Sequence, residues 1–219
     1  MVVGTMGAIS AFGGPVVWTS FTSATSTQAL GTLNGSAVTI TAASGIVPGS
    51  SSFGPSSLWA CGATCTATYA NSGLSVTTGG AANASLLAIQ AATTYTISVA
   101  PGLFGPVYLA FMSLGQGGVP VTYTYTGLTG GTLQSGGAGS FGGSAITVTS
   151  NSVSGTEGNG WASFANSGSG ALTSFSFTSS AAEFYGGIQI GTMTPEPGTM
   201  ALLGGGLALL AGIRLRKRS

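Results

Sequence analysis

The sequence predicts an all-β fold: an antiparallel β-sandwich or jelly-roll-like body, followed by a single short C-terminal transmembrane helix. Three observations predict it. Apolar and polar residues alternate in short runs, clusters rich in Gly, Asn, Ser and Pro separate these runs, and one uncharged apolar segment lies near the C-terminus. We expect residues 1–14 to be a residual or truncated leader, 15–192 the β-sandwich ectodomain, and 193–219 a separate C-terminal segment.

Alternating apolar residues predict strands that place one face in the core and the other in water. The alternating sets are Val38 and Ile40; Tyr95, Ile97 and Val99; Val121, Tyr123 and Tyr125; Ile146 and Val148; and Phe175 and Phe177. Val107–Met112 is apolar at every position, which is typical of a central strand covered on both sides. Leu86–Gln90 favours a strand over a short helix, and the clusters Pro48–Ser52, Gly115–Gly118 and Gly136–Gly139 predict turns or loops.

The composition excludes several classes of function. Gly, Ser and Thr account for 98 of the 219 residues, seven residues carry charge, and the chain has no His and no Asp. Without His there is no Ser-His-Asp or Cys-His catalysis and no imidazole metal site. Without Asp the usual oxygen cage for calcium is hard to build. We therefore expect no metal and no cofactor. The Gly/Ser richness also suits a disordered linker, but 43% hydrophobic residues favour an ordered body.

The charges are unevenly placed along the chain. Residues 1–195 carry only Glu157 and Glu183, so most of the chain lacks the cations that nucleic-acid binding requires. The two carboxylates are candidates for an acid/base pair acting on glycosides. We expect both to be solvated surface groups instead, because the charged neighbours that perturb catalytic groups are scarce here. The chain is therefore expected not to be an enzyme.

The aromatic residues have two interpretations. Trp18, Trp59, Trp161, Tyr123 and Tyr125 are able to stack on sugar rings, which would make the body a carbohydrate-binding jelly-roll module. Aromatic residues at alternating positions more often fill a core, and that is the outcome we expect. Tyr108 and Tyr185 depart from strict alternation and are expected to be the more exposed rings.

The C-terminal segment has three parts in a fixed order. Pro195, Glu196 and Pro197 form a rigid extended motif, since each proline fixes its own backbone and restricts its predecessor. An uncharged apolar stretch follows, with the residues Met200, Leu202, Leu203, Leu207, Leu209, Leu210 and Ile213, and then the basic residues Arg214, Arg216, Lys217 and Arg218. As a helix the 14 residues of 200–213 would reach only ~21 Å, short of the ~30 Å hydrocarbon core. The basic end is expected to remain cytoplasmic, which places the body across the membrane.

This order closely resembles the PEP-CTERM sorting signal of Gram-negative envelope proteins, over Thr194–Ser219. The resemblance implies that an exosortase, a membrane protease or transpeptidase, recognises Pro195, Glu196 and Pro197. It also implies that 200–213 is a transient membrane segment with a stop-transfer tail at Arg214–Arg218. The protein would then be released or attached at the cell surface, in company with exopolysaccharide and biofilm matrix. Gly198 stands where Ser or Ala is commoner, and a plain tail anchor is the alternative.

Two further features bear on export. Cys61 and Cys65 are the only cysteines, and in an oxidising envelope we expect a structural disulfide rather than a redox pair. Met1–Gly14 lacks the basic residues and continuous apolar stretch of an export leader, so we expect most of the leader to be missing from this sequence. The segments at 160–164, 172–177 and 183–191 are similar to the closing strands of ectodomains that carry such signals.

Overall fold

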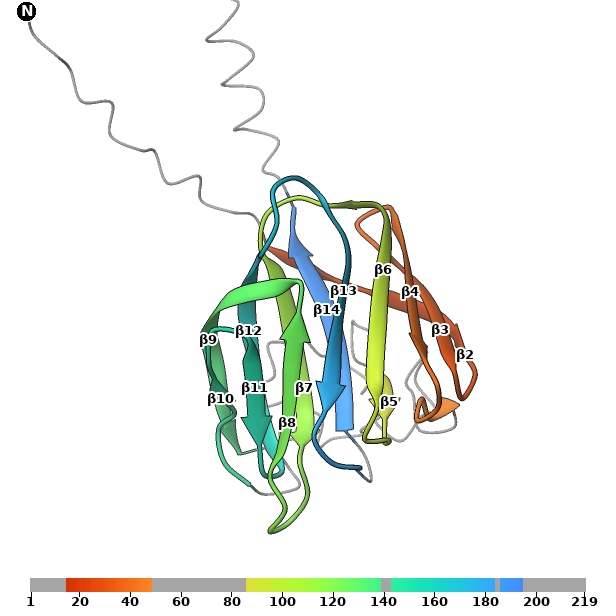
Figure 1. Ribbon diagram of the computed structural model, residues 1–219. Helices are drawn as coiled ribbons and strands as arrows, with labels where there is room; N and C mark the ends of the chain where they lie inside the picture. The colour runs from red at the N-terminus through yellow and green to blue at the C-terminus, as the bar shows by residue number, and fades with distance from the viewer. Residues whose placement is uncertain (1–14, 49–85, 139–142, 184–185, 195–219) are drawn as a thin grey trace, which may run out of the picture. The chain divides into compact units, whose positions relative to one another are not determined.

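The computed structural model describes residues 15–48, 86–138, 143–183 and 186–194 (Figure 1). Within these ranges every regular element is a strand, and the strands form two antiparallel sheets, so the predicted all-β architecture is confirmed. The chain divides into two compact units, residues 17–192 and residues 1–16 together with 193–219. In the described part of the chain no helix has the length and apolarity to cross a membrane. The predicted helix at 200–213 lies outside the described residues.

The first sheet has six strands. Its order is β1 (Val16–Trp18), β14 (Gly186–Met193), β7 (Val107–Leu114), β12 (Gly158–Asn166) and β9 (Leu128–Ala138), with β5 (Leu87–Ile89) also paired to β14. The predicted strand at Leu86–Gln90 is confirmed as β5. The last described strand, β14, therefore lies inside this sheet and pairs with β7 (Figure 1).

The second sheet has eight strands. Its order is β10 (Thr147–Val148), β11 (Ser152–Gly155), β8 (Val121–Thr126), β13 (Leu172–Ser179), β6 (Thr94–Leu103), β4 (Ser36–Ala42), β3 (Gln28–Leu33) and β2 (Ser20–Ala24). Strands far apart in sequence are neighbours here, for example β4 with β6 and β8 with β13. The strand order pairs strands in which buried apolar and exposed polar residues alternate, so that the apolar residues of neighbouring strands share one face.

The core lies between the two sheets and follows the alternation of the sequence. Val38 and Ile40 of β4 pair with Val99 and Ile97 of β6, and all four are at most 2% exposed. Phe177 of β13 packs its ring against three tyrosines, with centroid distances of 4.9 Å to Tyr95, 4.8 Å to Tyr123 and 5.8 Å to Tyr125. The predictions that these strands alternate and that Tyr123 and Tyr125 belong to the core are confirmed.

Strand β7 is buried along its whole length, as its continuous apolar run predicts. Each of its eight residues is buried, including Ala110 and Met112 on the face turned away from the second sheet. It lies between β14 and β12, with Tyr108 opposite Gly191 on one side and Ser163 on the other. A strand with neighbours on both edges and cover on both faces favours apolar side chains, which explains the Val-Tyr-Leu-Ala-Phe-Met run. Ser113, near the end of the strand, is polar and buried, and its hydroxyl has a hydrogen-bond partner in Glu157.

Glycine-rich strands are the main departure from the sequence-based expectation. The turn expected at Gly136–Gly139 is wrong for its described residues, because β9 continues to Ala138 and pairs with β12. On the partner strand β12, glycine is required for space at Gly160, opposite Gly136, because a Cβ there would lie 2.5 Å from a carbon of Ile146. Ile146 is buried as predicted, but the strand expected around it covers only Thr147 and Val148.

The outer face of the second sheet carries hydroxyl groups in place of charges. The side chains of Thr41, Ser98 and Thr126 are exposed, and the Thr94 and Thr178 hydroxyls form a hydrogen bond of 2.8 Å across β6 and β13. These positions alternate with the core residues of the same strands. The exposed face is therefore polar and hydrated, and the strands that form its centre, β8, β13, β6 and β4, contain no Asp, Glu, Lys or Arg.

The sandwich has two ends that differ in their turns. We call the end at which β14 stops the exit end; the pairs Thr192 with Val107 and Leu172 with Leu103 place the β6–β7 and β12–β13 turns there. We call the opposite end, with the β7–β8 turn at Gly115–Val119, the acidic end, for reasons given below. The turn predicted at Gly115–Gly118 is confirmed, with its backbone closed by hydrogen bonds of 3.0 and 2.9 Å between Gln116 and Val119.

Candidate functional site

Both glutamates of the sandwich meet at the β7–β8 turn. Glu183 follows β13 and precedes β14, and Glu157 lies between β11 and β12, so they are 26 positions apart in sequence. Each accepts a hydrogen bond from a backbone N–H of the same turn, Glu183 from Gly115 at 3.2 Å and Glu157 from Gly117 at 3.0 Å. The strand order brings them together, since β7, β8, β12 and β13 all begin or end at this end of the sandwich.

Glu183 is a buried carboxyl group with an exposed fraction of only 3%. The Tyr123 hydroxyl, which points into the sandwich from β8, donates a hydrogen bond to one carboxyl oxygen, and the Gly115 N–H donates to the other. Gly186 packs so closely that a Cβ there would lie 2.3 Å from Glu183 Oε2. The expectation that Glu183 is a solvated surface group is therefore wrong, because the β13–β14 connection turns it inward onto Tyr123.

Burial controls the ionisation of this pair. The pKa of Glu183 is raised from 4.5 to about 7. Desolvation by burial is the largest cause; the hydrogen bonds from Tyr123 and Gly115 lower the pKa, and the nearby charge of Glu157 raises it. The pKa of Tyr123 is well above its ordinary value, first because the ring is buried and second because Glu183 is close. Near neutral pH the site therefore holds a mixture of protonated and ionised Glu183.

Glu157 is half-buried and holds the start of the same turn. The Ser113 hydroxyl donates to Glu157 Oε2, while Oε1 accepts from Gly117. Ser113 and Glu157 both have φ of 54°, in the left-handed region that non-glycine residues seldom occupy. The Asn159 side chain supports this geometry by accepting a 2.9 Å bond from the Ser113 N–H. Glu157 is thus more enclosed than the solvated surface position that we expected.

The arrangement is suited to holding a turn. All four carboxyl oxygens of the two glutamates accept a hydrogen bond from Ser113, Gly115, Gly117 or Tyr123. A carboxylate committed in this way orders the backbone around it, as an anion does in a cradle of N–H groups. The sequence does not identify Ser113 and Tyr123 as hydrogen-bond partners of the two glutamates. The only feature that points to this place is the glycine-rich turn between two predicted strands.

The aromatic residues divide between the core and the outer face of the first sheet. Trp161 of β12 lies on the face turned away from the second sheet, where its ring meets Trp18 at 6.2 Å and Tyr108 at 5.7 Å. Trp18 and Trp161 are half-buried. Tyr108 is 5% exposed, so the expectation of an exposed ring there is wrong, because the outer face of β7 is covered as well. Trp59 and Tyr185 lie outside the described residues.

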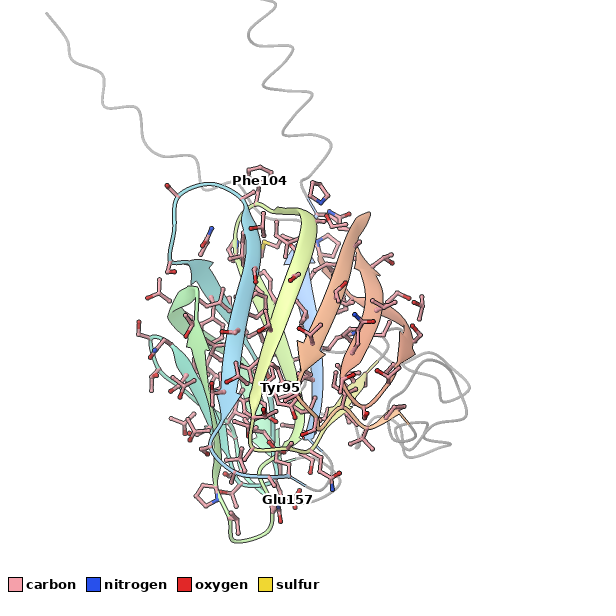
Figure 2. The ribbon with its side chains drawn as sticks, turned by 45° about the vertical axis from the view of Figure 1, so that its right-hand side comes forward. Tyr95, Phe104 and Glu157 are labelled. Atoms are coloured by element: carbon pink, nitrogen blue, oxygen red, sulfur yellow. The ribbon has the colours of Figure 1, made fainter. Side chains whose placement is uncertain are left out.

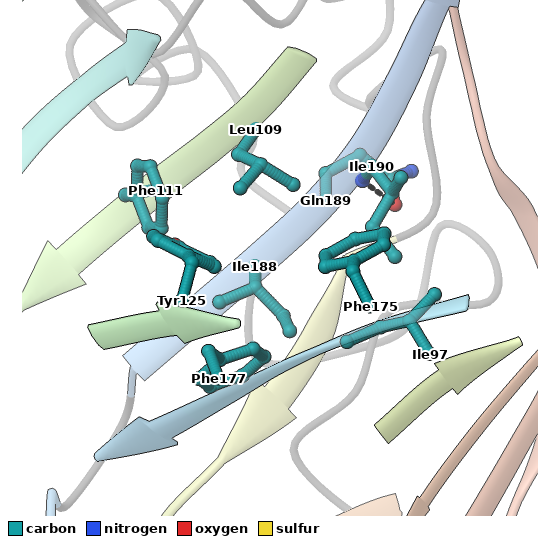
Figure 3. Close-up of a pocket in the computed structure, with 9 residues that line it drawn as sticks. All are labelled: Ile97, Leu109, Phe111, Tyr125, Phe175, Phe177, Ile188, Gln189 and Ile190. Atoms are coloured by element: carbon teal, nitrogen blue, oxygen red, sulfur yellow. Dashed lines mark hydrogen bonds between the residues drawn. The ribbon is translucent and has the colours of Figure 1, made fainter. Parts of the chain in front are cut away.

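A small cavity lies inside the core, between the two sheets (Figure 3). Its volume is about 10 Å³, room for about one water molecule, and its lining is apolar apart from Gln189. Gln189 donates its side-chain amide to the Thr19 carbonyl at 2.5 Å and accepts the Ile190 N–H at 3.3 Å. The lining is Ile97, Leu109, Phe111, Tyr125, Phe175, Phe177, Ile188, Gln189 and Ile190. This cavity is a packing gap, and its size excludes an organic ligand.

Other predicted sites lie outside the described residues. They are the sorting motif Pro195, Glu196 and Pro197, the apolar stretch 200–213, the basic residues Arg214, Arg216, Lys217 and Arg218, and the cysteines Cys61 and Cys65. In the part of the chain that the structure describes, no three His, Cys, Asp or Glu side chains gather into a group that could hold a metal ion.

Comparison with known proteins identifies the C-terminal segment. Residues 194–218 match the family model of the PEP-CTERM protein-sorting motif, so this motif is present directly after β14. The motif supports an exported protein that is anchored at the membrane by its C-terminus and processed by an exosortase-type membrane enzyme. The searches of curated proteins and of solved structures give no significant match.

Proposed function

We propose that this chain is a non-enzymatic surface or matrix protein whose PEP-CTERM motif at 194–218 is cleaved by an exosortase-type enzyme, with a β-sandwich as the delivered cargo. The observation that carries the proposal is the position of the motif. β14 ends at Met193, and the motif begins at the next residue. Cleavage within the motif would leave all fourteen described strands in the released product.

The geometry of the acidic end supports a non-enzymatic body. The two carboxylates that could form an acid/base pair use their oxygens to hold the β7–β8 turn. The cavity described above lies among core side chains and does not adjoin either carboxylate. Acid/base chemistry on a glycoside needs a cleft between the two groups, whereas Glu183 is buried with 3% of its surface exposed.

Association with exopolysaccharide or biofilm matrix is the cellular setting that we propose for the delivered sandwich. The support for it is the resemblance of the C-terminal segment together with the uncharged, hydroxyl-bearing outer face of the second sheet. Such a face hydrogen-bonds with neutral polymers and meets no charge repulsion from them.

Intact-mass analysis of the protein from its native host, with and without the exosortase-type enzyme, tests the proposal. We expect the enzyme to remove the mass beyond Pro195–Pro197, and the measured mass to reveal any glycan or lipid that is added and the true N-terminus. A Glu196→Ala variant is the matched control and should remain unprocessed in both strains. A chain that ends at Ser219 in both strains would contradict sorting and favour a plain tail anchor.

A carbohydrate-binding module is the second candidate, and one observation favours it. Trp161 and Trp18 are half-buried neighbours on the outer face of the first sheet. On the same face the exposed side-chain amide of Gln134 donates a hydrogen bond of 2.9 Å to the Ser163 hydroxyl. Aromatic rings beside amide and hydroxyl groups form the usual contacts to a neutral sugar. Calorimetric titration with neutral oligosaccharides, comparing the protein with Trp161→Ala, tests it; equal heats for both proteins would remove this candidate.

A further inference from the structure

The two ends of the sandwich differ in charge. Both carboxylates of the described residues, Glu157 and Glu183, lie at the acidic end around the β7–β8 turn. Figure 2 shows Glu157 at one end and Phe104 at the other. The turns of the exit end are Asn34–Gly35, Phe104–Pro106 and 167–171, and none of these residues is charged.

The exit end presents a strongly exposed aromatic ring. Phe104, at the tip of the β6–β7 turn, has 79% of its surface exposed, the largest fraction among the exposed large apolar side chains of the described residues. It is followed by Gly105, with φ of +86° and open space around it, and by Pro106. A ring on a turn with most of its surface in water is available to a partner outside the sandwich.

The exit end is also the end joined to the sorting motif. β14 stops at Met193, and the apolar stretch begins at Met200, so only residues 194–199 connect the two. Six residues, fully extended, span at most about 20 Å. While the apolar stretch is in the bilayer, β14's last residue is therefore held within about that distance of the membrane surface.

We propose that the exit end rests on the lipid bilayer before processing, with the Phe104 ring inserted at the boundary between headgroups and acyl chains. This inference rests on the proposed function, because the C-terminal motif supplies the tether. The interface accepts aromatic rings readily. The described turns of the exit end carry no carboxylate and therefore meet no repulsion from anionic headgroups, whereas the acidic end would. The lipid surface is favoured over the membrane enzyme because the short tether holds the exit end close to the bilayer whether or not the enzyme is bound.

The test uses the full chain reconstituted in vesicles of phosphatidylethanolamine and phosphatidylglycerol with brominated acyl chains. A Phe104→Trp variant places a fluorophore at the exit end. Val119→Trp is the matched control, since Val119 is an exposed apolar residue (46%) in the turn of the acidic end. The signal of the unsubstituted chain, with its own three tryptophans, is subtracted from both.

We expect the Trp at position 104 to be quenched about twofold more strongly than the one at position 119, with emission shifted to shorter wavelength. If the chain floats with the vesicles and the two positions are quenched equally, the inference is overturned while membrane delivery stands. If the chain does not float with them, both proposals fail. If Phe104→Ser slows processing in the host and position 104 shows no lipid quenching, the ring contacts the enzyme, which also overturns the inference.

Discussion

The Tyr123 hydroxyl donates a hydrogen bond to the buried carboxyl group of Glu183, and this contact joins the core of the sandwich to its β7–β8 turn. Tyr123 also packs its ring against Phe177 and Phe111, so one residue belongs to both the aromatic core and the acidic end.

Stability should depend on pH through Glu183. Its pKa in the folded chain is about 7, against 4.5 as the ordinary value. Between these values the folded state holds a proton that the unfolded state has lost, so the free energy of unfolding is greatest below pH 4.5 and falls as the pH rises to about 7. The fall is on the order of 3 kcal/mol. Urea unfolding from pH 4 to pH 8 measures it. A Glu183→Gln variant, which cannot ionise, should show a much flatter profile; an unchanged profile would contradict the assignment.

Removing the Tyr123 hydroxyl should destabilise the protein most at high pH. In Tyr123→Phe the ionised Glu183 loses its strongest side-chain donor while it stays buried, a loss of about 1–3 kcal/mol. Tyr125→Phe is the control, since Tyr125 is also a buried ring that contacts Phe177 and its change leaves the Glu183 contact in place. Chemical unfolding at pH 8 compares them. Equal losses in the two variants would mean that the hydrogen bond contributes little.

Gly115 should be intolerant of any side chain. Its φ is +87°, and a Cβ would lie 2.3 Å from the carbonyl oxygen of Gly155. Gly115→Ala should therefore lower the free energy of unfolding by several kcal/mol, through both strain and overlap with backbone. Gly117→Ala, in the same turn but with open space, should change it by less than about 1 kcal/mol. Thermal unfolding monitored by circular dichroism distinguishes them, and similar melting temperatures would contradict the close approach.

Two phenylalanines should respond in opposite ways. Phe177 is 3% exposed and packs against three tyrosines, so Phe177→Ala should cost about 3–5 kcal/mol. Phe104→Ala should change the free energy of unfolding by less than about 0.5 kcal/mol in the absence of lipid, because 79% of Phe104 is already in water. Urea unfolding without vesicles is the measurement. A large loss for Phe104→Ala would mean that this ring has a structural role.

The sequence predicts strands wherever the polarity of successive side chains indicates which face of a sheet they occupy. Alternating Val, Ile, Tyr and Phe identified β4, β6, β8 and β13, and the apolar run identified β7. The sequence does not predict the end of β9, because its glycines have no side chain whose polarity indicates a buried or an exposed face. The expectation of a turn at Gly136 is wrong for this reason. The meeting of Glu157 and Glu183 is also not predicted by the sequence, because that contact follows from strand order and not from any spacing in the chain. The C-terminal motif could be identified since its parts are contiguous.

The hydroxyl-bearing face of the second sheet has a consequence for how copies of the protein behave together. Threonine and serine hydroxyls keep their hydration at any pH from acid to mild alkali, and they have no ionic atmosphere for salt to compress. Two copies that approach through Thr41, Ser98 and Thr126 therefore meet no Coulomb barrier. At high local concentration, the cost of contact between copies through this face is the removal of bound water. Such contact should therefore depend little on ionic strength.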